Sequence, residues 1–201
     1  MGDELIERRR HPRSMRNAPA VHIDRQVSIV TLQLDDARAG DESAFLRLIE
    51  PALPAAERLA RAMLDGRPEA EDALQEAVVN AWKHLRQFKA GFPVEPWFLA
   101  IVANQCRMQR RVRWWSVMPL SRPQETPIAG GQPSAEITDL RRALQRLPHH
   151  QRLLLVLRYY LDQSFEDIGR TLGISPGAAK SRTLRALKRL RLEVPEEVSN
   201  D

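Results

Sequence analysis

The sequence predicts an all-α protein made of two small helical domains joined by a flexible linker. Apolar residues recur at intervals of three and four through most of residues 41–115 and 137–192, which is the repeat of helices with one buried face. The stretch between them, residues 116–136, is too rich in proline, glycine and small polar residues to form a core element. No strand-rich region or internal repeat interrupts this pattern.

The first 34 residues are predicted to be a disordered extension. The segment RRRHPRSMRNAPA is basic, contains proline and has no apolar periodicity, so it lacks the residues of a packed core. Residues 27–34 are more apolar. They could form a strand or lead into a helix, and the sequence does not decide between the two.

Residues 35–115 are predicted to form a compact bundle. Two short amphipathic segments come first and end at Asp65-Gly66, and a longer helix follows Pro68. Its apolar residues have the spacing of a buried stripe, namely Ala73, Leu74, Ala77, Val78, Ala81, Trp82 and Leu85. Its other side carries Glu71, Asp72, Gln75, Glu76 and Lys83. Taken alone, this acidic stripe could be only the solvated face of a surface helix.

A loop and a second long helix complete this bundle. Gly91 and Pro93 break the preceding helix, and a further helix is predicted to start at Trp97. Its later turns carry Asn104, Arg107, Arg110 and Arg111 before Trp114-Trp115. Trp97 fits a core position as well as an aromatic platform for a nucleic-acid base. The arginines could be only solvent-exposed charges without a specific role. The sequence leaves both questions open.

Residues 137–193 are predicted to form the second domain, and residues 194–201 a tail. An amphipathic helix containing Leu140, Leu144 and Leu147 stops at Pro148. The run LLLVLRYYL is apolar enough to be the central buried helix of this domain.

The domain closes with two helices joined by a tight turn. Ser164 and the acid three residues after it form a capping box, which starts a helix at the next residue. Gly173 can adopt the left-handed conformation that ends a helix. Ser175 then supplies a second N-cap, with Pro176 at the first helical position. This order predicts a helix-turn-helix.

The second helix of this pair has one packing face and one free face. The packing face is predicted to be Ala179, Thr183, Ala186, Leu187 and Leu190. The free face is predicted to be Ala178, Ser181, Arg182, Arg185 and Arg189. Residues 176–192 contain several cations and no acid, which is typical of a helix that enters the major groove of DNA.

Charge and composition restrict the classes of function that the chain can have. The net charge of +5 is unevenly distributed, because residues 137–192 contain twelve bases and four acids. This excess favours a polyanionic partner. No apolar run approaches the length of a membrane span and no signal-peptide core is found, so we expect a cytoplasmic protein without membrane insertion. Cys106 is the only cysteine, which excludes an internal disulfide.

No pattern in the chain predicts catalysis, a cofactor or a metal. A metal-dependent phosphohydrolase could use the carboxylates of residues 69–76, but it would need a second carboxylate-bearing helix, and none is evident. There is no glycine-rich phosphate loop and no nucleophile motif. His149 and His150 have no ligands at metal spacing, and we expect them to be exposed polar residues. The sequence therefore does not predict an enzyme.

The order of these pieces resembles the extracytoplasmic-function (ECF, group IV) sigma factors of bacterial RNA polymerase, over roughly residues 38–192. The resemblance is carried by GDESAFLRLIE, PEAEDALQEAVVNAWKHL, PWFLAIVANQCRMQRR and the segment from LRRALQRLP to LRALKRLR. It implies a region-two-like domain over residues 35–115 and a region-four-like domain over 137–193. It also implies binding to core RNA polymerase, promoter recognition and promoter opening.

The resemblance also implies site residues. Those facing core polymerase would be Glu71, Asp72, Gln75 and Glu76. Those contacting the downstream promoter element would be Arg86, Phe88, Lys89, Trp97, Asn104, Arg107, Arg110 and Arg111, with residues 86–96 as the loop that captures an unstacked base. Those contacting the upstream element would be Ser175, Gly177, Ala178, Lys180, Ser181, Arg182 and Arg185. An anti-sigma factor is a further implied partner.

One alternative of a different kind remains. The chain could be a helix-turn-helix transcriptional regulator in which residues 35–115 form a sensor or dimerisation domain. Such a protein would bind promoter DNA without binding core polymerase, so binding to purified core polymerase in the absence of DNA separates the two hypotheses.

Overall fold

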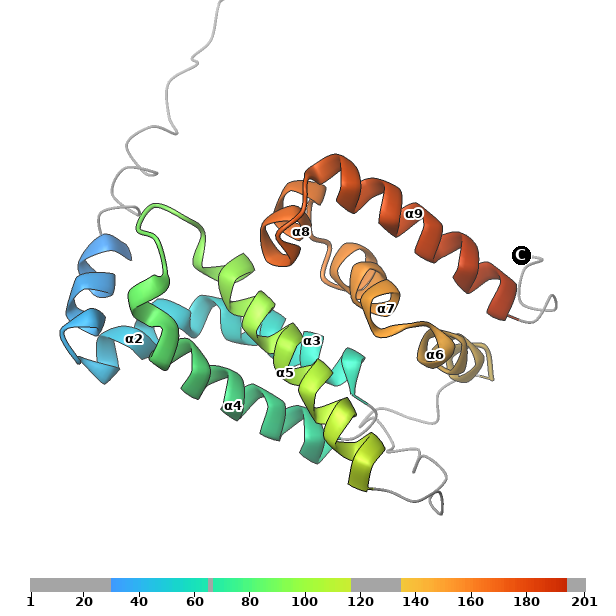
Figure 1. The fold of residues 1–201 in the computed structure, drawn as a ribbon, viewed down its shortest axis with the longest axis horizontal. Coiled ribbons are helices and arrows are strands. Elements are labelled where there is room, and N and C mark those ends of the chain that lie inside the picture. Colours follow the sequence, from blue (N-terminus) through green and yellow to red (C-terminus); the bar gives the residue numbers. More distant parts are fainter. Residues whose placement is uncertain (1–29, 65–66, 117–134, 195–201) are drawn as a thin grey trace, which may run out of the picture.

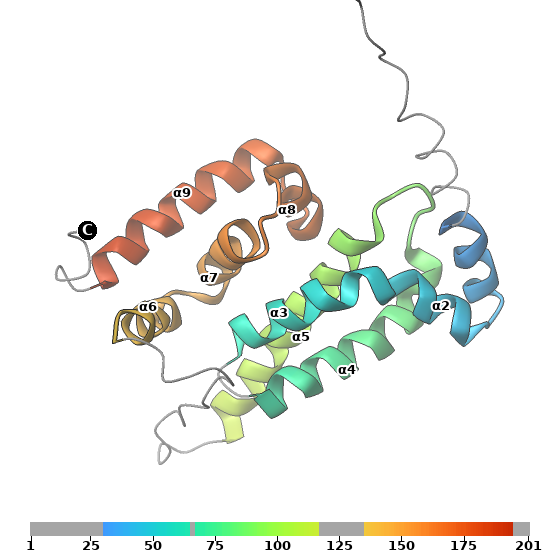
Figure 2. The same ribbon diagram turned by 180° about the vertical axis from the view of Figure 1, so that it is seen from behind.

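The computed structural model describes residues 30–64, 67–116 and 135–194, with the side chains of residues 67, 111–116 and 135–136 left outside that description. The predicted extension, linker and tail therefore lie largely outside the described residues. Within these ranges the chain forms helices and turns and contains no strand (Figures 1 and 2). The predicted fold class, all-α with two small helical domains, is confirmed. No described helix is both long enough and apolar enough to cross a bilayer.

The helices follow one another in two groups. The first group is a helix over residues 30–38, α2 (Glu42–Ile49), η1 (Glu50–Ala52), α3 (Leu53–Met63), α4 (Arg67–His84), η2 (Leu85–Gln87) and α5 (Val94–Ser116). The second is α6 (Ala135–Arg146), α7 (His149–Leu155), η3 (Val156–Tyr160), α8 (Phe165–Leu172) and α9 (Pro176–Glu193). We call these groups the N-terminal bundle and the C-terminal bundle.

Helix α5 is the centre of the N-terminal bundle. It packs against α3 and α4 and also contacts α2. Phe98, Leu99 and Val102 on its inner face are fully buried. Cys106 on the same face is also fully buried, and this burial raises the pKa of its thiol to about 12. The cysteine is thus a small core residue and stays in the unreactive thiol form.

The open question over residues 27–34 is settled in part. Residues 30–38 are helical, and Leu34 is fully buried in the core. The prediction that the disordered extension reaches residue 34 is therefore wrong for residues 30–34, because Leu34 is needed to fill the core. The end of this helix is tied to the loop before α5, because the Arg38 guanidinium donates a hydrogen bond to the Phe88 carbonyl. Residues 27–29 lie outside the described part of the chain.

Helix α5 begins three residues earlier than the sequence predicted, at Val94 rather than Trp97. Pro96 is therefore inside its first turn. A proline is tolerated there because the first amide groups of a helix have no intrahelical partner.

The C-terminal bundle is built around α7, α8 and α9. Helix α9 packs against α6, α7 and α8. The run predicted as one buried helix is buried from Leu153 to Leu157 and again at Leu161, but not throughout. The helix widens into a π-helical turn, η3, and places Tyr159 and Tyr160 more than half exposed. The prediction rested on the apolar composition of the run, which does not reveal a π-helical turn.

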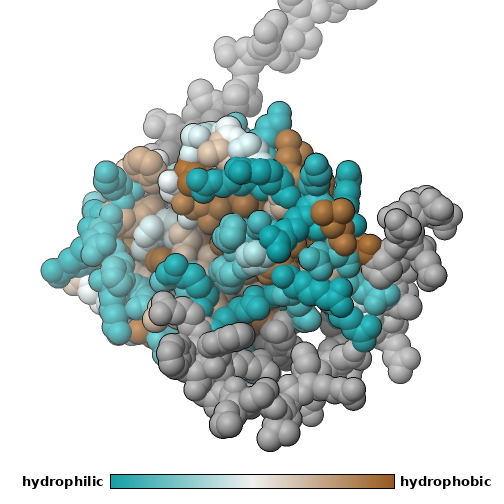
Figure 3. Space-filling model, turned by 45° about the vertical axis from the view of Figure 1, so that its right-hand side comes forward, coloured by the Kyte–Doolittle hydropathy of each residue, from teal (hydrophilic) through white to brown (hydrophobic). Residues whose placement is uncertain are grey.

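Hydrophilic side chains cover most of the face shown in Figure 3, with hydrophobic side chains visible between them. The two bundles also pack against each other, through α5 with α8 and through α3 with α7 and η3.

Candidate functional site

The outer face of α9 is exposed as the sequence predicted. Ala179, Thr183 and Ala186 are fully buried against the rest of the C-terminal bundle, and Leu190 is nearly so. The Thr183 hydroxyl is satisfied there by donating to the Ala179 carbonyl at 2.8 Å. The opposite face is exposed at Ser181, Arg182, Arg185 and Arg189, with Ala178 half-buried beside them. The division of the helix into a packing face and a free face is confirmed.

The free face is strongly cationic. No salt bridge is found for Arg182 or Arg185 within the described ranges, and Arg185 makes only a long 3.4 Å hydrogen bond to the Ser181 carbonyl. At the start of α9, the Ser175 hydroxyl accepts from the Ala178 amide at 3.2 Å, while Gly177 and Lys180 are exposed. A helix N-terminus beside a lysine favours phosphate. The side chains are therefore available for base edges and backbone alike.

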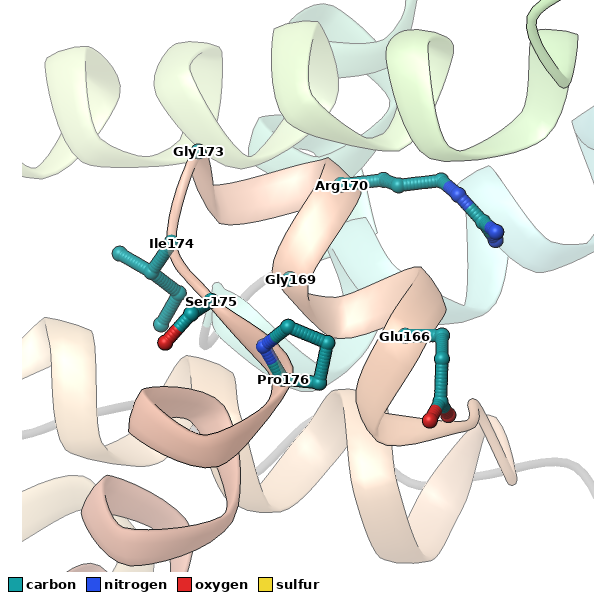
Figure 4. Close-up of a pocket in the computed structure, with 7 residues that line it drawn as sticks. All are labelled: Glu166, Gly169, Arg170, Gly173, Ile174, Ser175 and Pro176. Atoms are coloured by element: carbon teal, nitrogen blue, oxygen red, sulfur yellow. The ribbon is translucent and has the colours of Figure 1, made fainter.

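The turn between α8 and α9 has the geometry of a helix-turn-helix. Ser164 caps α8 by accepting from the Asp167 amide at 3.1 Å, although the Asp167 carboxylate accepts from the Ser164 hydroxyl rather than from a backbone amide. Gly173 ends α8 in the left-handed conformation, with φ of 65°. The turn borders an open hollow of ≈ 430 Å³, lined by Glu166, Gly169, Arg170, Gly173, Ile174, Ser175 and Pro176 (Figure 4).

Gly169 sets how closely α8 approaches this turn. A Cβ atom at Gly169 would lie 2.7 Å from the Ile174 carbonyl oxygen, whereas a Cβ at Gly177 would meet nothing within 4 Å. We expect Gly169→Ala to lower the free energy of unfolding, because overpacking against backbone costs about 1–3 kcal/mol and outweighs a gain of about 1 kcal/mol in helix propensity. Urea unfolding followed by circular dichroism measures this change.

The matched control is Gly177→Ala, which makes the same substitution in open space. It should leave stability unchanged or raise it slightly. A Gly169→Ala protein at least as stable as the parent would contradict the role given to this close approach.

The loop before α5 is supported by an aromatic pair. The Phe88 and Trp97 rings lie 4.9 Å apart between centroids, and Trp97 is half-buried. The expectation that Phe88 contacts the downstream element does not fit its burial, because the ring is only 3% exposed. The buried Phe88 ring instead packs against the half-buried ring of Trp97. Arg86 and Lys89 on the same loop are exposed.

The predicted polar residues of α5 differ in their availability. Asn104 and Arg107 are exposed and joined by a 2.7 Å hydrogen bond from the guanidinium to the amide oxygen. Arg110 is half-buried, and its Nη1 atom is buried without a hydrogen-bond partner. Arg111 belongs to α5, but its side chain lies outside the described residues. The side chain of Arg107 is thus accessible to a nucleic-acid strand, whereas the side chain of Arg110 is only partly accessible.

The acidic stripe of α4 is exposed. Glu71, Asp72, Gln75 and Glu76 all lie on the surface, opposite the buried alanines of the same helix. Val79, which is not among the predicted site residues, is 46% exposed one turn beyond them. The signal that could have found it is its position three residues after Glu76, on the polar side of the helix. Acids around an apolar residue form a surface suited to a basic protein partner.

Comparisons with known proteins agree with this geometry. Residues 48–116 match the family model "Sigma-70 region 2" and residues 137–190 match "Sigma-70, region 4". The ECF RNA polymerase sigma factor SigM of Mycobacterium tuberculosis is 34% identical over 154 residues, which is 76% of this chain and 78% of SigM. The RNA polymerase sigma factor CarQ of Myxococcus xanthus is 32% identical over 158 residues, which is 77% and 91% of the two chains.

The chain belongs to the ECF RNA polymerase sigma factors. Among solved structures, it is similar to the sigma factor RpoE of Bartonella quintana, in co-crystals with the anti-sigma factor NepR. That similarity has a TM-score of 0.59 and 28% identity, and covers 74% of this chain and 95% of RpoE.

This sigma factor is a transcription initiation factor that binds core RNA polymerase and directs promoter recognition and opening. The region 2 match takes in α3, α4 and α5, with the acidic stripe and the loop before α5. The region 4 match takes in α6 to α9, with the cationic face of α9.

The sequence of this sigma factor does not reveal the surroundings of His149. His150 is exposed as expected, but His149 is half-buried and its Nε2 atom is buried without a hydrogen-bond partner. Burial, followed by the charges of Arg110 and Arg152, lowers the pKa of His149 to about 4. The cause is tertiary, because Arg110 comes from the other bundle, so no local pattern could reveal it.

The lowered pKa of His149 predicts a pH dependence of stability. As pH falls from about 6.5 to about 4, the unfolded chain binds a proton at His149 and the folded chain does not, so stability present above pH 6.5 is lost. After discounting for the partial exposure of the ring, we expect a loss of about 1–2 kcal/mol. Urea unfolding at several pH values measures it.

His149→Gln should flatten this dependence, whereas the matched control His150→Gln should keep it. Equal slopes for His149→Gln and the parent protein would contradict the prediction.

Proposed function

We propose that the sigma factor divides promoter recognition between its two bundles, as functional domains over residues 35–115 and 137–193. In this proposal α9 enters the major groove of the upstream element. The main support is the exposed face of α9, on which neither Arg182 nor Arg185 is buried against the rest of the protein. Ala178, Ser181, Arg182 and Arg185 would read base edges, and Ser175, Gly177 and Lys180 would contact the backbone.

The N-terminal bundle would serve two other surfaces. Glu71, Asp72, Gln75 and Glu76 would bind a basic surface of core polymerase, with Val79 as an apolar contact among them. The downstream element would be bound by the exposed or half-buried residues Arg86, Lys89, Trp97, Asn104, Arg107 and Arg110, together with Arg111. Stacking on Trp97 and phosphate contacts along α5 supply the two ingredients that single-strand binding requires.

Finer assignments complete the proposal. The two matched regions support placing the chain in group IV of the sigma factors. The protein would act in the cytoplasm beside RNA polymerase, and it would have no enzymatic activity of its own. An anti-sigma factor is a further partner, because the similar RpoE of Bartonella quintana was co-crystallised with one. Residues 1–29, 116–136 and 194–201 would be an extension, a linker and a tail.

Run-off transcription with purified core polymerase on genomic fragments tests the proposal. The expected result is a discrete transcript that depends on adding this protein, and mapping its start identifies the promoter. Absence of any such transcript, together with no binding to core polymerase without DNA, would favour a helix-turn-helix regulator instead.

A further inference from the structure

The helix over residues 30–38 is packed against the N-terminal bundle. Leu34 and Ala37 on its inner face are buried, and both belong to the same core as Phe88. Arg38 follows at the end of this helix, and its guanidinium donates a hydrogen bond to the Phe88 carbonyl. The helix lies beside the connection between α4 and α5 that contains this carbonyl (Figures 1 and 2). A side chain of a packed helix thus holds one backbone group of the loop over residues 86–96.

Phe88 is the last buried residue before an exposed turn. Its ring packs against Trp97, whereas residues 89–93 are all exposed. Within this stretch the Phe92 amide donates to the Lys89 carbonyl at 3.2 Å, and Gly91 between them has φ of 84°. A glycine with positive φ at the third position is typical of a type II turn. Packing does not fix the place of this exposed turn, so its position depends on the anchor at Phe88.

The turn presents an aromatic ring and a cation to solvent. Phe92 is 58% exposed, and Lys89 at the other end of the turn is exposed too. Phe92 is not among the predicted site residues, which include the buried Phe88 instead. Bases stack on aromatic rings and phosphates are attracted by cations, which are the two contacts that single-strand binding requires. The turn therefore offers both groups to an unstacked nucleotide.

Arg38 contributes little to the stability of the fold. Its Nε atom is buried without a hydrogen-bond partner, which is unfavourable. Its ion pair with Asp35 spans 3.8 Å and the Asp35 side chain is 67% exposed, so this pair contributes little as well. Replacing a half-buried cation with an apolar side chain of similar length is often neutral. The hydrogen bond to the Phe88 carbonyl is therefore the contact of Arg38 whose loss we expect to matter.

We propose, resting on the strand-binding function proposed above for the N-terminal bundle, that Arg38 is a positioning residue for capture of the unstacked base. By holding the Phe88 carbonyl, it fixes the turn of residues 89–92 so that Phe92 and Lys89 face the strand bound by Trp97 and α5. Arg38 itself does not touch the DNA. It lies before residue 48, where the match to region 2 begins, so that match assigns it no role.

Arg38→Met in the full chain tests this proposal, because methionine keeps an unbranched apolar side chain and has no donor. Arg38→Lys is the second variant, since its ammonium group can still donate to the Phe88 carbonyl. The matched control is Arg47→Met, which removes an arginine whose ion pair is with Asp41 rather than with the loop.

Binding is measured to a labelled single-stranded oligonucleotide of the downstream element, which run-off transcription identifies. The same measurement is made with oligonucleotides that carry an abasic site at each position in turn. Urea unfolding followed by circular dichroism compares the stability of the variants.

In the parent protein, an abasic site at the captured position should weaken binding about tenfold, which is within the range for loss of one stacked base. In Arg38→Met this difference should largely disappear, because binding to the intact strand becomes weaker, while the urea midpoint stays that of the parent. Arg38→Lys should restore much of the difference, and Arg47→Met should keep all of it.

An Arg38→Met protein that keeps the full difference would overturn the proposal. So would an equal loss on intact and abasic strands, which would indicate a phosphate contact by Arg38 itself. A large fall in the urea midpoint of Arg38→Met, or no restoration by Arg38→Lys, would also overturn it, because the effect would not come from the hydrogen bond. A parent protein that directs no transcription with core polymerase, or shows no sensitive position, would instead reject the underlying function.

Discussion

Replacing Asp72 and Glu76 together with lysine is expected to remove most of the binding to core RNA polymerase. The two acids are exposed and one helical turn apart on α4, so they present negative charge on one surface. Reversal converts attraction to a basic partner into repulsion, and we expect a loss of about 2–5 kcal/mol in binding free energy. Titration of a labelled protein with core polymerase, without DNA and at physiological ionic strength, measures the loss.

The matched control reverses two other exposed acids of the same bundle, Glu42 and Glu50. It makes the same change in net charge away from the stripe and should leave polymerase affinity nearly unchanged. Binding to an upstream-element duplex should be retained in both variants, because α9 is untouched. Equal polymerase affinity in the two variants would show that the stripe is only a solvated helix face.

The second large effect is expected at α9. Arg182→Ala or Arg185→Ala should each cost about 1–3 kcal/mol at the cognate upstream element if the guanidinium reads a base edge. Both arginines are exposed and free of ion pairs within the described residues, so neither substitution disturbs the fold. Fluorescence anisotropy of the full chain with cognate and scrambled duplexes separates the two kinds of contact.

A base contact predicts a loss on the cognate duplex and relaxed specificity, whereas a phosphate contact predicts an equal loss on all duplexes and a shallower salt dependence. Arg191→Ala, an exposed residue in the last turn of α9, is the matched control and should have a smaller effect. An unchanged affinity for both duplexes in the Arg182 and Arg185 variants would remove α9 from the recognition surface.

Local rules were sufficient for much of this molecule. The caps of α8 and α9 involve residues within three positions of one another, and the two faces of α9 follow from helical periodicity alone. For the same reason the exposed stripe of α4 and the buried stripe beneath it were predictable.

Tertiary packing decided what the sequence did not reveal. Phe88 reads as a loop aromatic, yet it is buried beneath Trp97. His149 reads as a surface residue, yet burial and then the charge of Arg110, from a distant part of the chain, lower its pKa. Arg152 looks like one more cation in a basic segment, although its guanidinium is buried between helix ends. In each case a partner lies on another helix or across a loop, where the periodicity of one helix carries no information.

The helix over residues 30–38 affects how shortened versions of this protein can be prepared. The region 2 match begins at residue 48, but Leu34 and Ala37 are buried in the same core, and Arg38 anchors the loop that carries Phe88. Expression from the family boundary would delete part of the hydrophobic interior and release that loop. A truncation that keeps every residue from 30 onward retains both, so the natural starting point for an isolated N-terminal bundle lies well upstream of the recognisable family segment.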